Sequence, residues 1–159
     1  MNRIEKVREK VDYILLHMPD DEERRCAYVH LYGVAQACTL LAARCGVDAE
    51  LAVIAGMLHD LHAYAAMDAR DHAPKSAEMA RTLLMELGLF REDEISAVCT
   101  AIARHSDKQT VHGPLDEVLK DADVLQHMLY DPLQEGGETQ ENRRAKLMEE
   151  LGLHGVLLS

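Results

Sequence analysis

The stretch from residue 51 to residue 62 constrains the fold of this chain most strongly. It reads LAVIAGMLHDLH, and apolar residues occupy nearly every side of the helix that it would form, as in a helix surrounded by core. His59, Asp60 and His62 nevertheless stand near its end. Because imidazole and carboxylate groups without partners are costly in a dry core, we expect a metal ion to satisfy them.

Helical periodicity continues through the rest of the chain, and no run with a period of two indicates a strand. Counted from their caps, the expected helices cover residues 2–18, 20–45, 48–63, 75–87, 92–104, 114–129 and 139–151. Between them we expect two polar surface loops, 64–74 and 105–113, and a turn-rich connector, 131–138. The sequence therefore predicts an all-α, single globular domain of about six to seven helices over residues 1–159.

Composition and charge limit the partners of such a domain. Hydrophobic residues make up 48% and charged residues 28% of the chain, as in a globular domain. The formal net charge of -11 excludes a broad basic surface for DNA or RNA, and the absence of Trp with a single Phe leaves little for base stacking. A small anion recruited by a local metal remains compatible with this charge.

We expect neither a signal peptide nor a membrane span in this sequence. The charged N-terminal stretch has no signal-peptide pattern, and no apolar run approaches the length of a membrane span, so we expect no membrane partner. The four cysteines form no C-x-x-C pair, which favours reduced thiols in a cytoplasmic protein. The apolar tail 153–159, LHGVLLS, would pack back on the domain or meet a partner chain, as in a homo-oligomer.

Three of the expected helices carry inward-facing residues of the kinds that bind metals. His30 shares the apolar face of the second helix, and His59 and Asp60 end the third. In the sixth helix, Asp121 and Asp123 flank the apolar stripe at similar angles, so periodicity alone does not decide which one turns inward. Imidazole and carboxylate together suit Mn, Fe, Co, Ni, Zn or Mg, and an incomplete ligand set leaves room for water.

The order of these residues resembles a known signature. His30, then GMLHD at 56–60, then DADVL at 121–125 is similar to the pattern of the HD-domain superfamily of metal-dependent phosphohydrolases. The resemblance spans residues 26–130, which leaves the last helix and tail, 139–159, outside it. It implies one divalent metal held by His30, His59, Asp60 and Asp123, with Asp121 as the fallback ligand or as a partner of a ligand.

Some members of this superfamily bind a second metal through additional histidines. His72 and His105 lie in comparable stretches of this chain and are the candidates. The alternative is that His72 is a solvated loop residue and that His105 contacts substrate phosphate. We expect His62 to donate to a metal ligand, and the remaining histidines to lie on the surface; these are His17, His112, His127 and His154.

The resemblance also implies a reaction, in which metal-activated water attacks phosphorus in a small phosphorylated substrate such as a nucleotide. Asp60 would bridge metal and water, and His105 would act beside it. Arg104, Lys108 and Lys75 are the candidates for binding phosphate. Two alternatives stay open. One is an HD-type di-iron oxygenase, which needs the second metal, and the other is a non-catalytic metal-binding regulatory domain, which would be expected to lack one of the four ligands.

Overall fold

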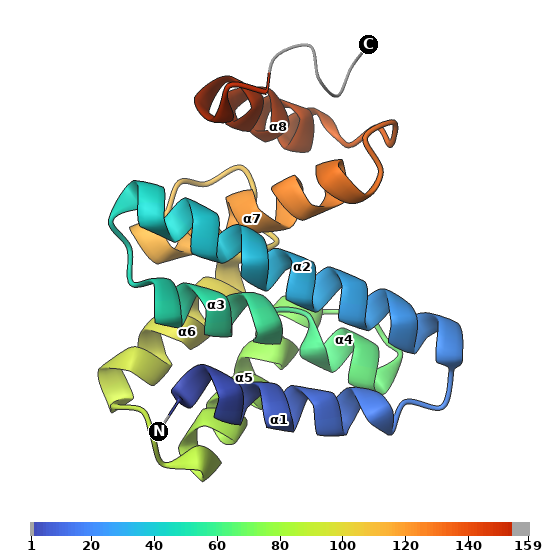
Figure 1. Cartoon of the computed structure of the whole chain (residues 1–159), viewed down its shortest axis with the longest axis vertical. Coiled ribbons are helices and arrows are strands. Elements are labelled where there is room, and N and C mark those ends of the chain that lie inside the picture. Colours follow the sequence, from blue (N-terminus) through green and yellow to red (C-terminus); the bar gives the residue numbers. More distant parts are fainter. Residues whose placement is uncertain (1, 154–159) are drawn as a thin grey trace.

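The structure, a computed structural model, describes residues 2–153, and every regular element in that range is an α-helix. The chain forms eight helices in this range, and Figure 1 shows how they are arranged. Their bounds are α1 Arg3–Leu16, α2 Asp21–Cys45, α3 Ala49–Leu58, α4 Leu61–Ala66, α5 His72–Leu87, α6 Glu92–Arg104, α7 Pro114–Tyr130 and α8 Glu138–Leu151. The prediction of an all-α single domain is confirmed. His154 and the rest of the tail to residue 159 lie outside the described residues, so the expectations for them stay predictions.

The helix boundaries follow from capping residues in the sequence. Asn2, Asp20 and Asp48 each accept a hydrogen bond from a backbone N–H in the first turn of α1, α2 and α3. Gly46 and Gly88 follow α2 and α5 with φ angles of 68° and 62°, a left-handed conformation that glycine adopts without steric cost. These signals explain why most of the predicted boundaries agree with the structure.

Helix α2 packs against both α3 and α7 (Figure 1). Gly56 brings α3 close to α2, because a Cβ atom at this position would lie only 2.8 Å from the Cα of Ala35 and 2.9 Å from its backbone nitrogen. The two helices therefore approach backbone to backbone. This contact brings His30 of α2 within reach of His59, which follows α3.

The third helix differs from the prediction. We expected it to continue to about residue 63, but α3 ends at Leu58 and the short α4 begins at Leu61. Asp60 leaves the helical conformation with φ -118° and ψ 11°, and it precedes α4 without accepting a capping hydrogen bond from that helix. The break accounts for the additional helix and leaves the Asp60 carboxylate available for other contacts.

The loop expected at residues 64–74 is shorter in the structure. Helix α4 extends to Ala66, and α5 begins at His72 rather than near residue 75. The intervening turn uses positive φ angles at Met67 and Asp71, 50° and 51°, which sequence periodicity does not signal for such residues. As a result, His72 lies in the first turn of a helix.

The expectation that no segment approaches the length of a membrane span is wrong for α2. Within residues 2–153, it is the one helix that is long and apolar enough to cross a membrane by length and composition. Half of that stretch is buried inside the domain, and a central core helix of a folded domain has the same length and composition.

Helix α8 is held against the domain by apolar and polar contacts. Leu147 and Met148 are buried in the core. In the same turn of the helix, the carbonyl oxygen of Glu150 accepts a hydrogen bond from Arg44 of α2 at 2.7 Å. Helix α8 thus packs against α7, and the Arg44 hydrogen bond ties its last turn to the C-terminal end of α2.

Candidate metal centre

His30 and His59 form the centre of a polar cluster within the core. His59 is fully buried and His30 is 7% exposed. The Nδ1 atom of His30 lies 2.8 Å from Oε1 of Gln126, and that of His59 lies 2.9 Å from the carbonyl oxygen of Gly56. Because both oxygens only accept, each Nδ1 donates, and the Nε2 of each neutral ring carries a lone pair.

These two Nε2 atoms face each other at 3.1 Å. Two lone pairs at this distance repel unless a proton or a metal ion lies between them. Burial lowers the pKa of His59 to about 4, which disfavours a proton there. For His30, burial lowers the pKa, but the Asp60 and Asp123 carboxylates outweigh that effect and raise it. A divalent cation bound by both nitrogens would remove the repulsion.

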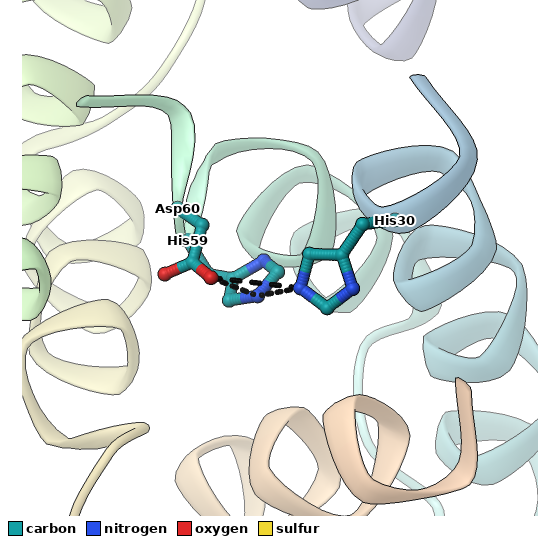
Figure 2. A group of neighbouring side chains, drawn as sticks. All are labelled: His30, His59 and Asp60. Atoms are coloured by element: carbon teal, nitrogen blue, oxygen red, sulfur yellow. Dashed lines mark hydrogen bonds and ion pairs between the residues drawn. The ribbon is translucent and has the colours of Figure 1, made fainter. Parts of the chain in front are cut away.

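Asp60 adds a carboxylate from the break between α3 and α4. Its Oδ2 lies 3.5 Å from Nε2 of His30 and 3.4 Å from Nε2 of His59. Figure 2 shows the three side chains pointing toward one another. Burial raises the pKa of Asp60, but the contacts with His59, His105 and His30 lower it well below its usual range. The carboxylate is therefore ionised and available as a ligand.

Asp123 of α7 contributes the second carboxylate. Its Oδ1 lies 3.6 Å from Nε2 of His30 and 3.9 Å from Nε2 of His59, and this buried oxygen has no hydrogen-bond partner among residues 2–153. Lys108 donates to the other oxygen, Oδ2, at 2.7 Å. Asp121 instead accepts a hydrogen bond from Arg143 at 2.6 Å. Of the two aspartates that periodicity left open, the structure brings Asp123 to the histidines.

A second group of ligand atoms lies on the other side of Asp60. The Oδ1 of Asp60 lies 3.2 Å from Nε2 of His105 and 3.6 Å from Nε2 of His72, and it is also buried with no hydrogen-bond partner in the described part of the chain. The Nδ1 atoms of these histidines donate to the carbonyl oxygens of Ile102 and Ala69. Their lone pairs therefore face Asp60, and Asp60 joins two pairs of histidines.

The chemistry of this donor set fits a metal. Among residues 2–153, ligand atoms within 4.8 Å of one another form four trios, which are His30–His59–Asp60, His30–Asp123–His127, His59–His105–Asp123 and Asp60–His72–His105. Imidazole nitrogens combined with carboxylate oxygens suit Mn, Fe, Co, Ni or Zn. The unpaired oxygens of Asp60 and Asp123 are the groups that a bound cation would satisfy.

Comparison with known proteins places this site in a family. The family model described as HD domain matches residues 27–128, which is more than half of the chain. The chain belongs to the HD domain family. The recognition made from the order of His30, His59–Asp60 and Asp123 is thereby confirmed.

A solved structure has the same fold. It is a crystal structure of a predicted HD superfamily hydrolase from an uncultured Thermotogales bacterium, and its TM-score to this chain is 0.61. The two chains are 23% identical, and the match covers 91% of this chain and 89% of that chain. No curated protein matches the chain. The likeness to the solved structure extends the HD fold beyond residues 27–128 to most of the chain.

The three basic residues that we predicted to bind phosphate lie in different parts of the structure. Lys108 contacts the HD site directly, through Asp123 and the carbonyl oxygen of His105. Lys75 donates to the carbonyl oxygen of Arg70 and lies 4.0 Å from Asp68. Arg104 ends α6 and pairs with Asp116 at 3.0 Å. The structure therefore does not bring Arg104 to the cluster, because its pairing with Asp116 directs it elsewhere.

A pocket of about 370 Å³ opens onto the Asp60 side of the cluster. Its lining includes Asp60, His72, Tyr64, Asp68 and Glu23. The His30 and Tyr64 rings lie 6.2 Å apart, centre to centre. A small ligand in this pocket would contact the acidic residues and the Tyr64 ring as well as the candidate ligands.

Two residues at the cluster were missed in the sequence. Gln126 fixes the His30 ring, and His127, expected at the surface, lies 3.4 Å from Oδ1 of Asp123. Helical spacing could have indicated both residues in part, because residues three and four positions after Asp123 lie on the same face of the helix as Asp123. His62 belongs to none of the four trios, and its buried Nδ1 has no hydrogen-bond partner within the described residues.

Proposed function

We propose that this HD domain is a metal-dependent phosphohydrolase that acts on a small phosphate ester such as a nucleotide. The observation that carries the proposal is the convergence of the His30 and His59 lone pairs with Oδ2 of Asp60 and with the buried Oδ1 of Asp123. Such a set would hold one divalent ion. When bound, the ion would lower the pKa of a coordinated water and neutralise a phosphate oxygen.

The chain's own residues would supply the remaining roles. Asp60 contacts both histidine pairs, so its carboxylate is suited to orient a water between them. His105 is 2% exposed and directs Nε2 toward Asp60, which suits a contact with water or with a phosphate oxygen. Lys108 lies on the loop after α6 and would attract phosphate to the site.

Local attraction is needed because the chain as a whole carries a formal charge of -11, which repels phosphates. The pocket beside Asp60 also contains Glu23 and Asp68. Carboxylates accept hydrogen bonds, so they favour the hydroxyl and amino groups of a nucleoside over a second phosphate. The limited volume of the pocket favours a small substrate.

The test is phosphate release from a panel of nucleotides and other small phosphate esters, with Mn, Co, Ni, Zn, Mg or Fe added in turn. We expect release that depends on metal, disappears in His59→Ala and Asp60→Ala, and weakens chiefly through KM in Lys108→Ala. Lys146→Ala is the matched control, because Lys146 is an exposed residue of α8 whose ion-pair partner is Glu150. Absence of release with every metal would contradict the proposal.

A second candidate function rests on the Asp60–His72–His105 trio. With the first cluster, it would hold two ions that share Asp60, as a di-iron oxygenase requires. Oxygen consumption by the iron-loaded, reduced protein, without phosphate release, would favour the oxygenase. Bound metal with neither activity would favour a regulatory domain.

A further inference from the structure

We propose that His127 is an additional ligand of the metal ion bound by His30, His59, Asp60 and Asp123. The inference rests on the metal site of the proposed function and adds a fifth protein ligand to it. His127 is not among the residues that the HD pattern of this sequence identifies. The proposal comes instead from its position on α7.

The first argument is the spacing along the helix. His127 follows Asp123 by four residues, so both side chains project from the same face of α7. Its Nε2 lies 3.4 Å from Oδ1 of Asp123, and its ring centre lies 4.9 Å from that of His30. His30, Asp123 and His127 form one of the four trios whose ligand atoms lie within 4.8 Å of one another.

The second argument is that His127 does not satisfy Asp123 by hydrogen bonding. The side chain of Asp123 is 11% exposed, and its Oδ1 has no hydrogen-bond partner despite the nearby Nε2. The 3.4 Å separation from Nε2 of His127 is longer than the usual range of about 2.7–3.2 Å for an N–H···O hydrogen bond. The Asp123 oxygen therefore keeps its lone pairs for a cation, beside a nitrogen that could bind the same cation.

The third argument is that the distances match those of a coordination sphere. Two neighbouring ligands, each about 2.0–2.2 Å from one ion, lie roughly 3 Å apart when they bind at right angles. The corresponding separations in this cluster are 3.1 Å for His30 and His59, 3.6 Å for His30 and Asp123, and 3.4 Å for His127 and Asp123. His127 thus lies at a ligand's distance from Asp123 and within one ligand trio with His30 and Asp123.

His127 also differs from the other histidines of the cluster. Its side chain is 46% exposed, and within residues 2–153 no hydrogen bond fixes its ring, whereas a carbonyl oxygen holds Nδ1 of each of the other four. It lies at the edge of a small pocket under the connector between α7 and α8. The ring can therefore turn toward an ion at little cost.

The experiment uses the full chain with saturating zinc and two readouts. In 15N-histidine-labelled protein, long-range 1H–15N NMR spectra report whether each Nε2 is protonated, free or metal-bound. The His127 signals are assigned as those absent from His127→Ala. Zinc affinity is then measured by competition with a chelator for the wild type, His127→Ala and the control His17→Ala, since His17 is exposed and lies at the end of α1.

We expect the His127 Nε2 to take the shift of a zinc-bound nitrogen, and His127→Ala to bind zinc at least ~10-fold more weakly while His17→Ala binds as the wild type does. If the Nε2 of His127 stays protonated in the zinc-loaded protein, the proposal is wrong. His127 would then orient Asp123 and would not bind the ion. Unchanged affinity in His127→Ala would also overturn it. If zinc binds but no phosphate is released, the proposed function fails while the ligand assignment stands.

Discussion

At the scale of single residues, the site depends on which nitrogen of each imidazole carries the proton. His30, His59, His72 and His105 each donate through Nδ1 to a carbonyl oxygen. Every Nε2 lone pair is therefore directed into the cluster before any ion arrives. Three of the four acceptors are backbone carbonyls three residues earlier in the chain, and the fourth is the side chain of Gln126.

Removal of the Gln126 carboxamide should weaken metal binding. In Gln126→Leu, the His30 ring loses its acceptor and is free to rotate or to change tautomer. We expect about 10–100-fold weaker affinity, measured by chelator competition. Gln36→Leu is the control, because Gln36 is exposed on the same helix as His30; equal affinity in the two variants would show that Gln126 does not orient His30.

The two aspartates of α7 should behave differently when each is replaced. Asp123→Ala removes a carboxylate that lies 3.6 Å from the His30 nitrogen, so elemental analysis should show little bound metal. Asp121→Ala removes a partner of Arg143, which keeps Glu117 at 2.9 Å, so metal content should stay near the wild-type value. The opposite pattern would mean that Asp121 is the ligand.

At the scale of helices, the break at residues 59 and 60 decides the geometry of the site. An aspartate that precedes a helix usually caps it, but Asp60 does not cap α4 and contacts four histidines instead. The sequence predicted α2 and the start of α3 well, because their caps and apolar faces are local signals. It did not predict the break, because the conformation of Asp60 depends on contacts with residues distant in sequence.

Gly56 provides a prediction at this scale. In the interior of a helix, Gly→Ala normally stabilises by up to about 1 kcal/mol. At Gly56 the added Cβ would meet the backbone of Ala35 at 2.8 Å, so we expect Gly56→Ala to reduce the free energy of unfolding by about 1–3 kcal/mol. Chemical denaturation measures the change.

Gly137→Ala is the matched control for this variant, because Gly137 has φ -67° and a Cβ atom added there would meet no other atom within 4 Å. Its unfolding free energy should fall by less than about 1 kcal/mol, since Gly137 is the N-cap of α8 and Ala is less favoured than Gly at that position. If Gly56→Ala proved as stable as the wild type, α2 and α3 would not be in backbone contact, and the placement of His30 beside His59 would lose its physical basis.

At the scale of the whole molecule, the candidate ligands come from positions between residues 30 and 127 and meet only in the folded domain. The order of the motifs was enough to predict His30, His59, Asp60 and Asp123 as a set, since the structure brings these four together. Other features required the tertiary structure. Arg104 pairs with Asp116. Lys120 is fully buried and donates hydrogen bonds to Thr110 and Glu117. Helical periodicity in the sequence predicts neither arrangement.

The central claim is that His30, His59, Asp60 and Asp123 bind one divalent ion. The most direct measurement is anomalous diffraction at the zinc edge from crystals of the full chain grown with saturating zinc. We predict a peak between the two facing Nε2 atoms, with Zn–N distances of about 2.0–2.1 Å, and a second peak beside Asp60, His72 and His105 if two ions bind. No peak between His30 and His59 would contradict the account.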